Sequence, residues 1–122
     1  MKKKLILMIV MLLCACMSKD LKLSGEYELV NAPVGSQITI LFDGNNFAGN
    51  SGVNRYFGTF EQSKNDIKFN TAGLTMMMGP ENLMQAEQKY LKDLSGVKNC
   101  SIKNGNLVLT GDNNIALEFK LK

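Results

Sequence analysis

The chain has 122 residues, with 14 lysines and arginines, 11 aspartates and glutamates, and no histidine. That length supports one small domain, and a composition of 45% hydrophobic and 20% charged residues excludes a disordered or collagen-like chain. Without histidine the chain cannot build a Ser-His-Asp or Cys-His nucleophile pair or a histidine-ligated zinc site. We therefore expect no catalytic residues, no metal site and no cofactor.

The first fifteen residues have the form of a secretory signal. Three lysines at positions 2–4 precede nine uninterrupted apolar residues at 5–13, and nine helical residues reach only about 14 Å, roughly half of a bilayer core. The residues at the end of this stretch, Leu13-Cys14-Ala15-Cys16, resemble a bacterial lipobox, whose last cysteine is lipidated after cleavage. By that resemblance residues 1–15 are removed and Cys16 carries the lipid. A plain cleaved signal that ends in cysteine is the alternative.

Cleavage before Cys16 also changes the charge balance. It removes three lysines and no acidic residue, so the remaining 107 residues carry 11 basic and 11 acidic side chains. A nucleic-acid partner is therefore not expected. We expect residues 16–22 to form a lipidated tether, residues 23–122 to form the domain, and the lipid to anchor the protein to a membrane of a bacterial cell envelope. Because Met17 stands where an aspartate would favour the inner membrane, we expect the outer membrane.

Alternating polar and apolar residues predict seven or eight strands along the rest of the chain. The predicted strands lie around residues 26–30, 38–42, 47–49, 56–60, 67–69, 100–103, 106–109 and 115–121. Within these strands, one face is bulky and apolar, and we expect it to face the core. The residues predicted to point inward are Ile38, Ile40, Phe42, Phe60, Phe69, Leu107, Leu109, Leu117 and Phe119.

The clearest turn signal is Asn104-Gly105, which lies between two alternating runs and predicts a two-residue type I′ hairpin turn. That turn pairs Ile102 with Leu107 and Cys100 with Leu109, so all four side chains are expected on the core face. Cys100 is the cysteine that remains after cleavage and lipidation. Its position on the core face predicts a buried small hydrophobic residue rather than a reactive thiol.

One helix is predicted at residues 81–94. Pro80 suits the first helical position, Glu81 suits the positive end of the helix dipole, and Gly96 suits the stop. One helix cannot cover both faces of so large a sheet, so the sheet should curl around its apolar side. The sequence thus predicts a mainly β (α+β) fold, a small antiparallel barrel or half-barrel with one packed helix. The apolar stripe expected to pack on the sheet consists of Leu83, Met84, Ala86, Tyr90, Leu91 and Leu94.

Residues 47–60 resemble the central motif of the META domain, the family of HslJ-like heat-shock lipoproteins. That motif runs Gly-x-x-Gly-Cys-Asn-x-aromatic-x-Gly-x-aromatic. Residues 75–94 and 23–29 resemble the family's helix block and opening block, so the resemblance spans residues 23–122. It implies a lipocalin-like antiparallel barrel, no established catalysis, and an association with stress and drug tolerance in some members. The motif positions fall on Gly49, Gly52, Val53, Asn54, Tyr56, Gly58 and Phe60.

Many members of the family carry a cysteine at each of the two positions that here hold Val53 and Gly79. Both cysteines are absent together, as expected if they form a disulfide in those relatives. The family's helix glutamate corresponds to Glu87. It falls beside the apolar stripe, and we expect it to hydrogen-bond to the sheet or to the motif loop.

The other motif residues have structural interpretations. We interpret Gly49, Gly52 and Gly58 as backbone requirements of tight turns and close strand approach. Asn54 is expected to cap or bridge backbone groups of its loop rather than bind a ligand. Arg55, the one arginine of the chain, is expected to be a solvated or ion-paired surface residue, with carboxylate recognition as the alternative.

Three consecutive methionines, Met76, Met77 and Met78, are the remaining unusual feature. With Met84 they offer soft ligands for Cu(I), but three consecutive residues cannot place all their sulfurs on one face. We favour core plasticity or an adaptable hydrophobic contact surface.

Two functional hypotheses remain. The first is a non-enzymatic, lipid-anchored protein-interaction or stress-tolerance accessory module with an envelope protein as its partner. The second is a carrier of a small hydrophobic ligand in the barrel interior. The bulky inward residues favour the first hypothesis, and an internal apolar cavity of roughly 300 Å³ or more would favour the second.

Overall fold

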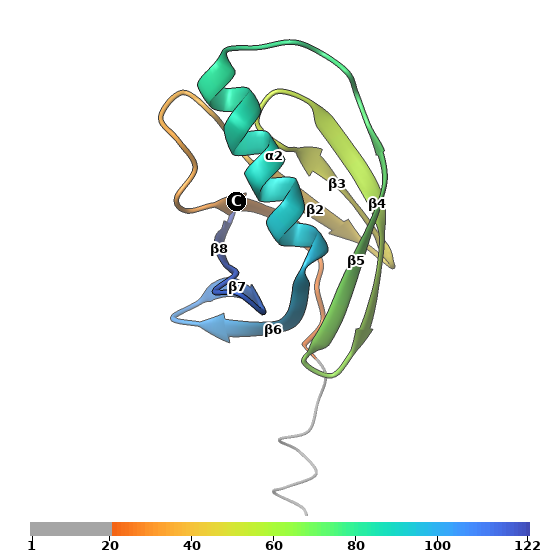
Figure 1. The fold of residues 1–122 in the computed structure, drawn as a ribbon. Helices are drawn as coiled ribbons and strands as arrows, with labels where there is room; N and C mark the ends of the chain where they lie inside the picture. Colours follow the sequence, from red (N-terminus) through yellow and green to blue (C-terminus); the bar gives the residue numbers. More distant parts are fainter. Residues whose placement is uncertain (1–20) are drawn as a thin grey trace, which may run out of the picture.

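The computed structural model describes residues 21–122, and residues 1–20, which include Cys16 and most of the expected tether, lie outside the described part of the chain. Eight antiparallel strands form a closed barrel in which each strand pairs with the next and β8 pairs with β1 (Figure 1). This confirms the predicted barrel with one packed helix. The elements are β1 (Gly25–Leu29), β2 (Thr39–Asp43), β3 (Asn46–Asn50), β4 (Arg55–Ser63), β5 (Asp66–Leu74), α2 (Glu81–Ser95), β6 (Val97–Lys103), β7 (Asn106–Gly111) and β8 (Ala116–Leu121).

Side chains of alternate strand residues fill the inside of the barrel. All nine residues predicted to point inward are buried, which confirms the prediction of the core face. Four phenylalanines, Phe42, Phe47, Phe60 and Phe69, pack together with ring centroids 5.4–6.3 Å apart, and such aromatic pairs stabilise a core beyond the area they bury.

The hairpin between β6 and β7 has the predicted turn. Asn104 and Gly105 have φ angles of 53° and 82°, as a type I′ turn requires, and Ile102 pairs with Leu107 as expected. Cys100 is a buried free cysteine. Ile102 lies on the same face as Leu107, as the predicted register requires, but the expectation that it is part of the core is wrong, since it is 48% exposed. On the side away from β7, β6 pairs with β5 at a single residue, Asn99, so Ile102, nearer the hairpin tip, lies beyond the part of β6 that pairs with β5.

Helix α2 lies across the barrel (Figure 1) and buries Glu87, Tyr90 and Leu94. Pro80 precedes the helix rather than beginning it, and its carbonyl accepts hydrogen bonds from the backbone N–H groups of Leu83 and Met84. No helix among residues 21–122 is long and apolar enough to cross a membrane.

Gly96 ends the helix, but not for the predicted reason. Its φ is −99°, so it does not adopt the left-handed conformation that favours glycine at a helix end. Its N–H donates to the carbonyl of Asp93 (3.0 Å), and a Cβ atom at this position would lie 2.6 Å from Cδ1 of Ile115, the movable end of that side chain.

The two ends of the barrel differ. The chain enters beside the β4–β5 turn, where the Gln62 side chain donates a hydrogen bond to the carbonyl of Leu21 and Leu23 is buried. The β3–β4 loop and residues 75–80 lie at the opposite end (Figure 1). An attachment that precedes Leu21 would therefore leave this opposite end facing away from it.

Candidate functional site

The most elaborate polar cluster among the described residues joins Glu87 of α2 to the motif loop, which we define as residues 51–54 between β3 and β4. The Glu87 side chain is only 3% exposed. Its Oε1 accepts hydrogen bonds from the Ser51 hydroxyl (2.6 Å) and from the backbone N–H groups of Val53 (3.1 Å) and Asn54 (2.6 Å). Its Oε2 accepts one from Nδ2 of Asn54 (2.8 Å). The carboxylate therefore satisfies four donors of one short loop.

The proton affinity of Glu87 reflects these contacts. Burial acts to raise the pKa of Glu87, but the hydrogen bonds from Ser51, Asn54 and Val53 outweigh burial and hold the pKa below its ordinary value. The group is thus an internal carboxylate stabilised by dipoles. Because its oxygens occupy the donors that converge on it, these donors are not available to an external anion.

Asn54 extends the cluster to the segment after β5. Its Oδ1 accepts hydrogen bonds from the backbone N–H of Met77 (2.5 Å) and the hydroxyl of Thr75 (2.9 Å), and its Nδ2 also lies 3.3 Å from the carbonyl oxygen of Met77. Asn54 therefore bridges the backbone groups of Met77 rather than those of its own loop, and it also bonds to the Thr75 hydroxyl. One side chain holds together the loop, α2 and the chain that leads into α2.

The three motif glycines lie where a side chain would clash or would strain the backbone. A Cβ atom at Gly49 would lie 2.1 Å from the Thr39 carbonyl oxygen, and one at Gly58 would lie 2.1 Å from that of Asn70. Gly52 has a φ of +130°, which side chains rarely adopt. The glycines let neighbouring strands and the loop approach closely, which agrees with their interpretation as backbone requirements.

Tyr56 links β4 to α2 inside the barrel. Its hydroxyl donates to the carbonyl of Thr39 (2.8 Å) and lies 2.5 Å from the hydroxyl of Tyr90, which is then the donor of that second bond. Burial, followed by the neighbouring Tyr90, raises the pKa of Tyr56 well above its ordinary value, and burial also raises the pKa of Tyr90. Both phenols therefore stay neutral and act as hydrogen-bonding core residues.

Arg55, next to Tyr56, is exposed. The ion pairs among residues 21–122 join Lys89 to Asp93, Lys98 to Asp112 and Lys122 to Glu26, and none of them includes Arg55. Within the described residues Arg55 is thus not ion-paired, and both its solvated and its carboxylate-recognition interpretations stay predictions.

Val53 and Gly79 are neighbours in space. A Cβ atom built on Gly79 would lie 3.5 Å from Cβ of Val53, which is within the range found across disulfides. The two positions that hold cysteines in many relatives are thus adjacent in this chain.

The three methionines are exposed, and the idea that they serve core plasticity is wrong. Met76, Met77 and Met78 are 88%, 58% and 87% exposed. The backbone bonds to Asn54 fix the main chain near the barrel while the side chains reach into solvent. An adaptable hydrophobic surface is the interpretation that agrees with this placement.

Ser51 and Thr75 belong to the site but were not singled out from the sequence. Ser51 is fully buried and bonds to Glu87, and Thr75 bonds to Asn54. Both lie inside the blocks that resemble the family motifs, 47–60 and 75–94, but a small hydroxyl residue is too common to predict such a contact.

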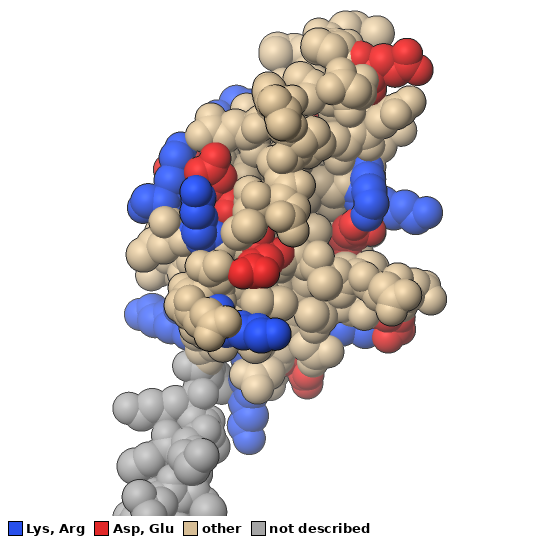
Figure 2. Space-filling view, turned by 90° about the vertical axis from the view of Figure 1, so that its left-hand side faces the viewer, with Lys and Arg blue, Asp and Glu red and all other residues tan. Residues whose placement is uncertain are grey.

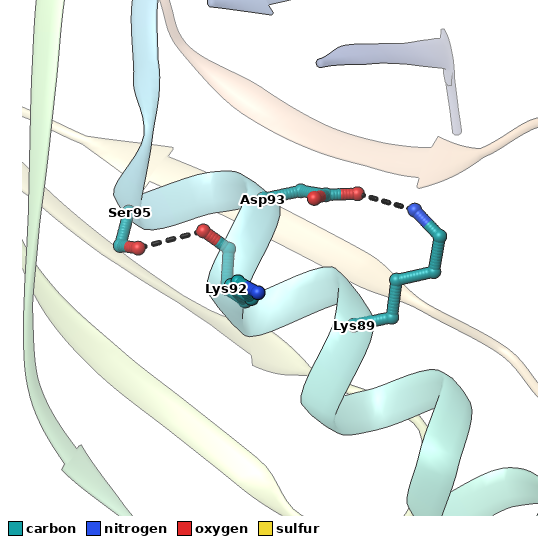
Figure 3. Close-up of polar contacts among 4 residues, drawn as sticks. All are labelled: Lys89, Lys92, Asp93 and Ser95. Carbon is teal, nitrogen blue, oxygen red and sulfur yellow. Dashed lines mark hydrogen bonds and ion pairs between the residues drawn. The ribbon is translucent and has the colours of Figure 1, made fainter. Parts of the chain in front are cut away.

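Surface clefts open on other parts of the described chain. One of about 700 Å³ separates β5 from β6, where the two strands share a single residue pair. Another, of about 290 Å³, lies between α2 and the strands β1 and β8; Leu29, Ile38 and Tyr90 line it, and Lys89 and Asp93 form part of its rim. Figure 3 shows the ion pair of Lys89 with Asp93 on α2 (2.8 Å). Within the described residues no three His, Cys, Asp or Glu side chains are grouped to hold a metal ion.

The fold and this cluster define a small antiparallel barrel that is tied to its helix by a buried carboxylate. The model of the META domain family matches residues 20–122, and the chain belongs to this family.

Two solved structures are similar in fold. An NMR structure of a protein from Burkholderia xenovorans has a TM-score of 0.70 and 23% identity, and the match covers 81% of this chain and 82% of that one. Another protein, also solved by NMR, has a TM-score of 0.59 and 20% identity, and the match covers 80% of this chain and 88% of that one. No curated relative matches the sequence.

Proposed function

We propose that the protein is a non-enzymatic, lipid-anchored accessory module of the bacterial cell envelope that acts by contacting another envelope protein. The observation that carries this proposal is the contrast between a barrel interior filled by side chains and an exposed apolar segment at one end. Bulky buried residues from all parts of the barrel form one core cluster. The methionine segment, residues 76–78, lies outside that core and is exposed.

The position of this apolar segment supports the proposal. It lies at the end of the barrel opposite to the entry of the chain (Figure 1), so a lipid on Cys16 would leave it facing away from the anchoring membrane. Methionine side chains are flexible and polarizable, and they recur on surfaces that adapt to protein partners. Figure 2 shows positive and negative side chains interspersed on one face, which suits a protein partner better than nucleic acid.

The second candidate is a carrier of a small hydrophobic ligand. The filled interior argues against a ligand inside the barrel, since pockets for small molecules usually enclose 300–1,000 Å³. The specific observation in its favour is the cleft of about 290 Å³ beside α2. This cleft lies at the surface, and the charged pair of Lys89 and Asp93 on its rim suits an apolar ligand poorly.

Site-specific crosslinking tests the proposal. Met77→Cys places a thiol on the exposed segment, and Ser63→Cys places one on the exposed end of β4, at the opposite end of the barrel. Both lipoproteins are treated with a thiol-specific crosslinker in cells of their own species. We expect a discrete adduct with one envelope protein from Met77→Cys and none from Ser63→Cys.

The opposite results would overturn the proposal. Equal adducts from the two variants would show that the contact is not specific to the methionine end. No adduct, together with a stoichiometric small lipid in the purified protein, would favour the ligand carrier instead.

A further inference from the structure

We propose that Met76, Met77 and Met78 form a site of reversible sulfur oxidation, at which a peroxide converts the thioethers to sulfoxides while the fold remains intact. The inference does not depend on the proposed partner, because it rests on the exposure of these side chains and the anchoring of their backbone.

Exposure to solvent distinguishes these three residues from the other sulfur-containing residues of the described chain. They are the most exposed sulfur-containing side chains among residues 21–122, whereas Met84 on α2 is partly buried and Cys100 is fully buried. Burial, with a smaller effect of Asp66, also raises the pKa of the Cys100 thiol, which disfavours the reactive thiolate. An oxidant in solution therefore meets the methionine segment first.

The backbone contacts explain why oxidation should leave the fold unchanged. Asn54 bonds to both the N–H and the carbonyl of Met77, and Thr75 donates its N–H to the carbonyl of Arg55 (3.0 Å). None of these bonds uses a methionine side chain. Sulfoxidation disrupts proteins when it places a polar group in a core, but here the new S=O groups remain in water.

The reaction balances with hydrogen peroxide as the oxidant. A lone pair of the thioether sulfur attacks one peroxide oxygen, the S–O bond forms as the O–O bond breaks, and the second oxygen takes up the protons and leaves as water. Sulfur loses two electrons and peroxide gains them. In reversal, a methionine sulfoxide reductase or a small dithiol returns two electrons, forms a disulfide and releases the oxygen as water. The product is a polar, chiral surface in place of an apolar one.

The test treats the mature lipoprotein in detergent with millimolar hydrogen peroxide and follows it by mass spectrometry. Trypsin cleavage at Lys68 and Lys89 gives one peptide that contains all four methionines of the domain, and fragmentation assigns each added oxygen. We expect three oxygens on the methionine segment before Met84 reacts, at least about threefold faster per residue. The thermal midpoint should change by less than about 2 °C, and sulfoxide reductase should restore the original mass.

Two controls keep the result interpretable. In urea all four methionines should react at similar rates, because unfolding removes the protection of Met84. The variant M76L/M77L/M78L should fold normally and lose the fast phase. Equal rates for Met84 in the folded protein, or unfolding after the third oxygen is added, would overturn the inference.

Discussion

Glu87 serves as an internal anion for a loop that would otherwise leave several N–H groups unsatisfied. Two backbone N–H groups, a hydroxyl and an amide of the motif loop converge on its two oxygens. A buried carboxylate is costly unless such bonds surround it. The residue therefore specifies how α2 sits against the loop, and its removal would leave the loop donors unpaired.

Replacement of this carboxylate by an amide should destabilise the domain in a pH-dependent way. In Glu87→Gln the amide NH₂ must face either Asn54 Nδ2 or the loop N–H groups, so at least one donor loses its acceptor. We expect a loss of about 1–3 kcal/mol of unfolding free energy at pH 7. Urea denaturation from pH 3 to pH 7 measures this loss, with Glu81→Gln, an exposed residue of the same helix, as the control.

The sign of the pH dependence follows from the lowered pKa of Glu87. A group whose pKa is lower in the folded state stabilises the fold above its unfolded pKa, near 4.3 for glutamate, and loses that contribution as pH falls through the folded value. The difference between wild type and Glu87→Gln should therefore shrink below about pH 4. A constant difference down to pH 3 would show that the charge of Glu87 is unimportant.

A single added methyl group should be much more harmful at Gly58 than at Gly44. In Gly58→Ala the new Cβ would clash with the Asn70 carbonyl oxygen and the Phe47 ring. We expect a loss of about 2–4 kcal/mol of unfolding free energy. Gly44 lies in the β2–β3 turn with φ +63° and open space around it, so Gly44→Ala should cost only about 1 kcal/mol for backbone strain. Thermal unfolding of both variants checks the order, and similar losses would contradict the clash.

At the scale of elements, two sets of polar contacts tie α2 to the barrel: the carboxylate cluster, which reaches the motif loop, and the tyrosine pair, which reaches β4. The tyrosine pair is asymmetric, because Tyr56 donates to Thr39 and accepts from Tyr90. Tyr56→Phe removes the partner of the buried Tyr90 hydroxyl and of the Thr39 carbonyl, so we expect a loss of about 1–3 kcal/mol of unfolding free energy. Tyr90→Phe leaves the Tyr56 bond to Thr39 intact and should cost about 1 kcal/mol. Denaturation midpoints of the two variants test which substitution destabilises more. A larger loss for Tyr90→Phe would contradict the assignment of Tyr90 as the donor to Tyr56.

The contact between the motif loop and the segment before α2 permits a covalent test. The double variant Val53→Cys/Gly79→Cys should form a disulfide on air oxidation, because the two Cβ positions lie 3.5 Å apart. A mass loss of two hydrogens, as measured by mass spectrometry, identifies the bond. The oxidised form should be more stable than the reduced form by about 2–4 kcal/mol. Each single variant serves as the control, and failure of the pair to oxidise would contradict the adjacency.

At the scale of the whole molecule, the barrel separates a tether end from a motif end. The chain enters by Leu21 beside Gln62, and the motif loop and the methionine segment lie at the other end (Figure 1). A short lipidated tether would thus present the motif end to the aqueous compartment.

Cys16→Ser tests the anchor itself. Without the thiol no diacylglycerol can be attached, so we expect the protein to move from the membrane fraction to the soluble fraction. Cell fractionation and palmitate labelling measure the change, and Cys100→Ser, at a buried thiol, is the control. A Cys16→Ser protein that stays bound to membranes and uncleaved would contradict the lipobox interpretation.

The sequence by itself determined most of the barrel. Period-2 alternation identified the inward residues, Asn104-Gly105 identified a type I′ turn, and the helix appeared where Pro80 and an apolar stripe predicted it. These features depend on residues within a few positions of one another, or on a register that one turn fixes. For that reason local propensity and hydrophobic pattern are enough to predict them.

Only the tertiary structure decided the site. The partners of Glu87 lie 33–36 positions away in the sequence, so no local pattern connects them, and Ser51 gained its role only by burial beside that carboxylate. The same holds for Ile102, which is exposed where β6 extends beyond its pairing with β5 at Asn99. The methionines are exposed because Asn54 holds their backbone at the end of the barrel. Each of these outcomes depends on which distant element lies opposite a residue, and that is set by the closure of the barrel and the packing of α2.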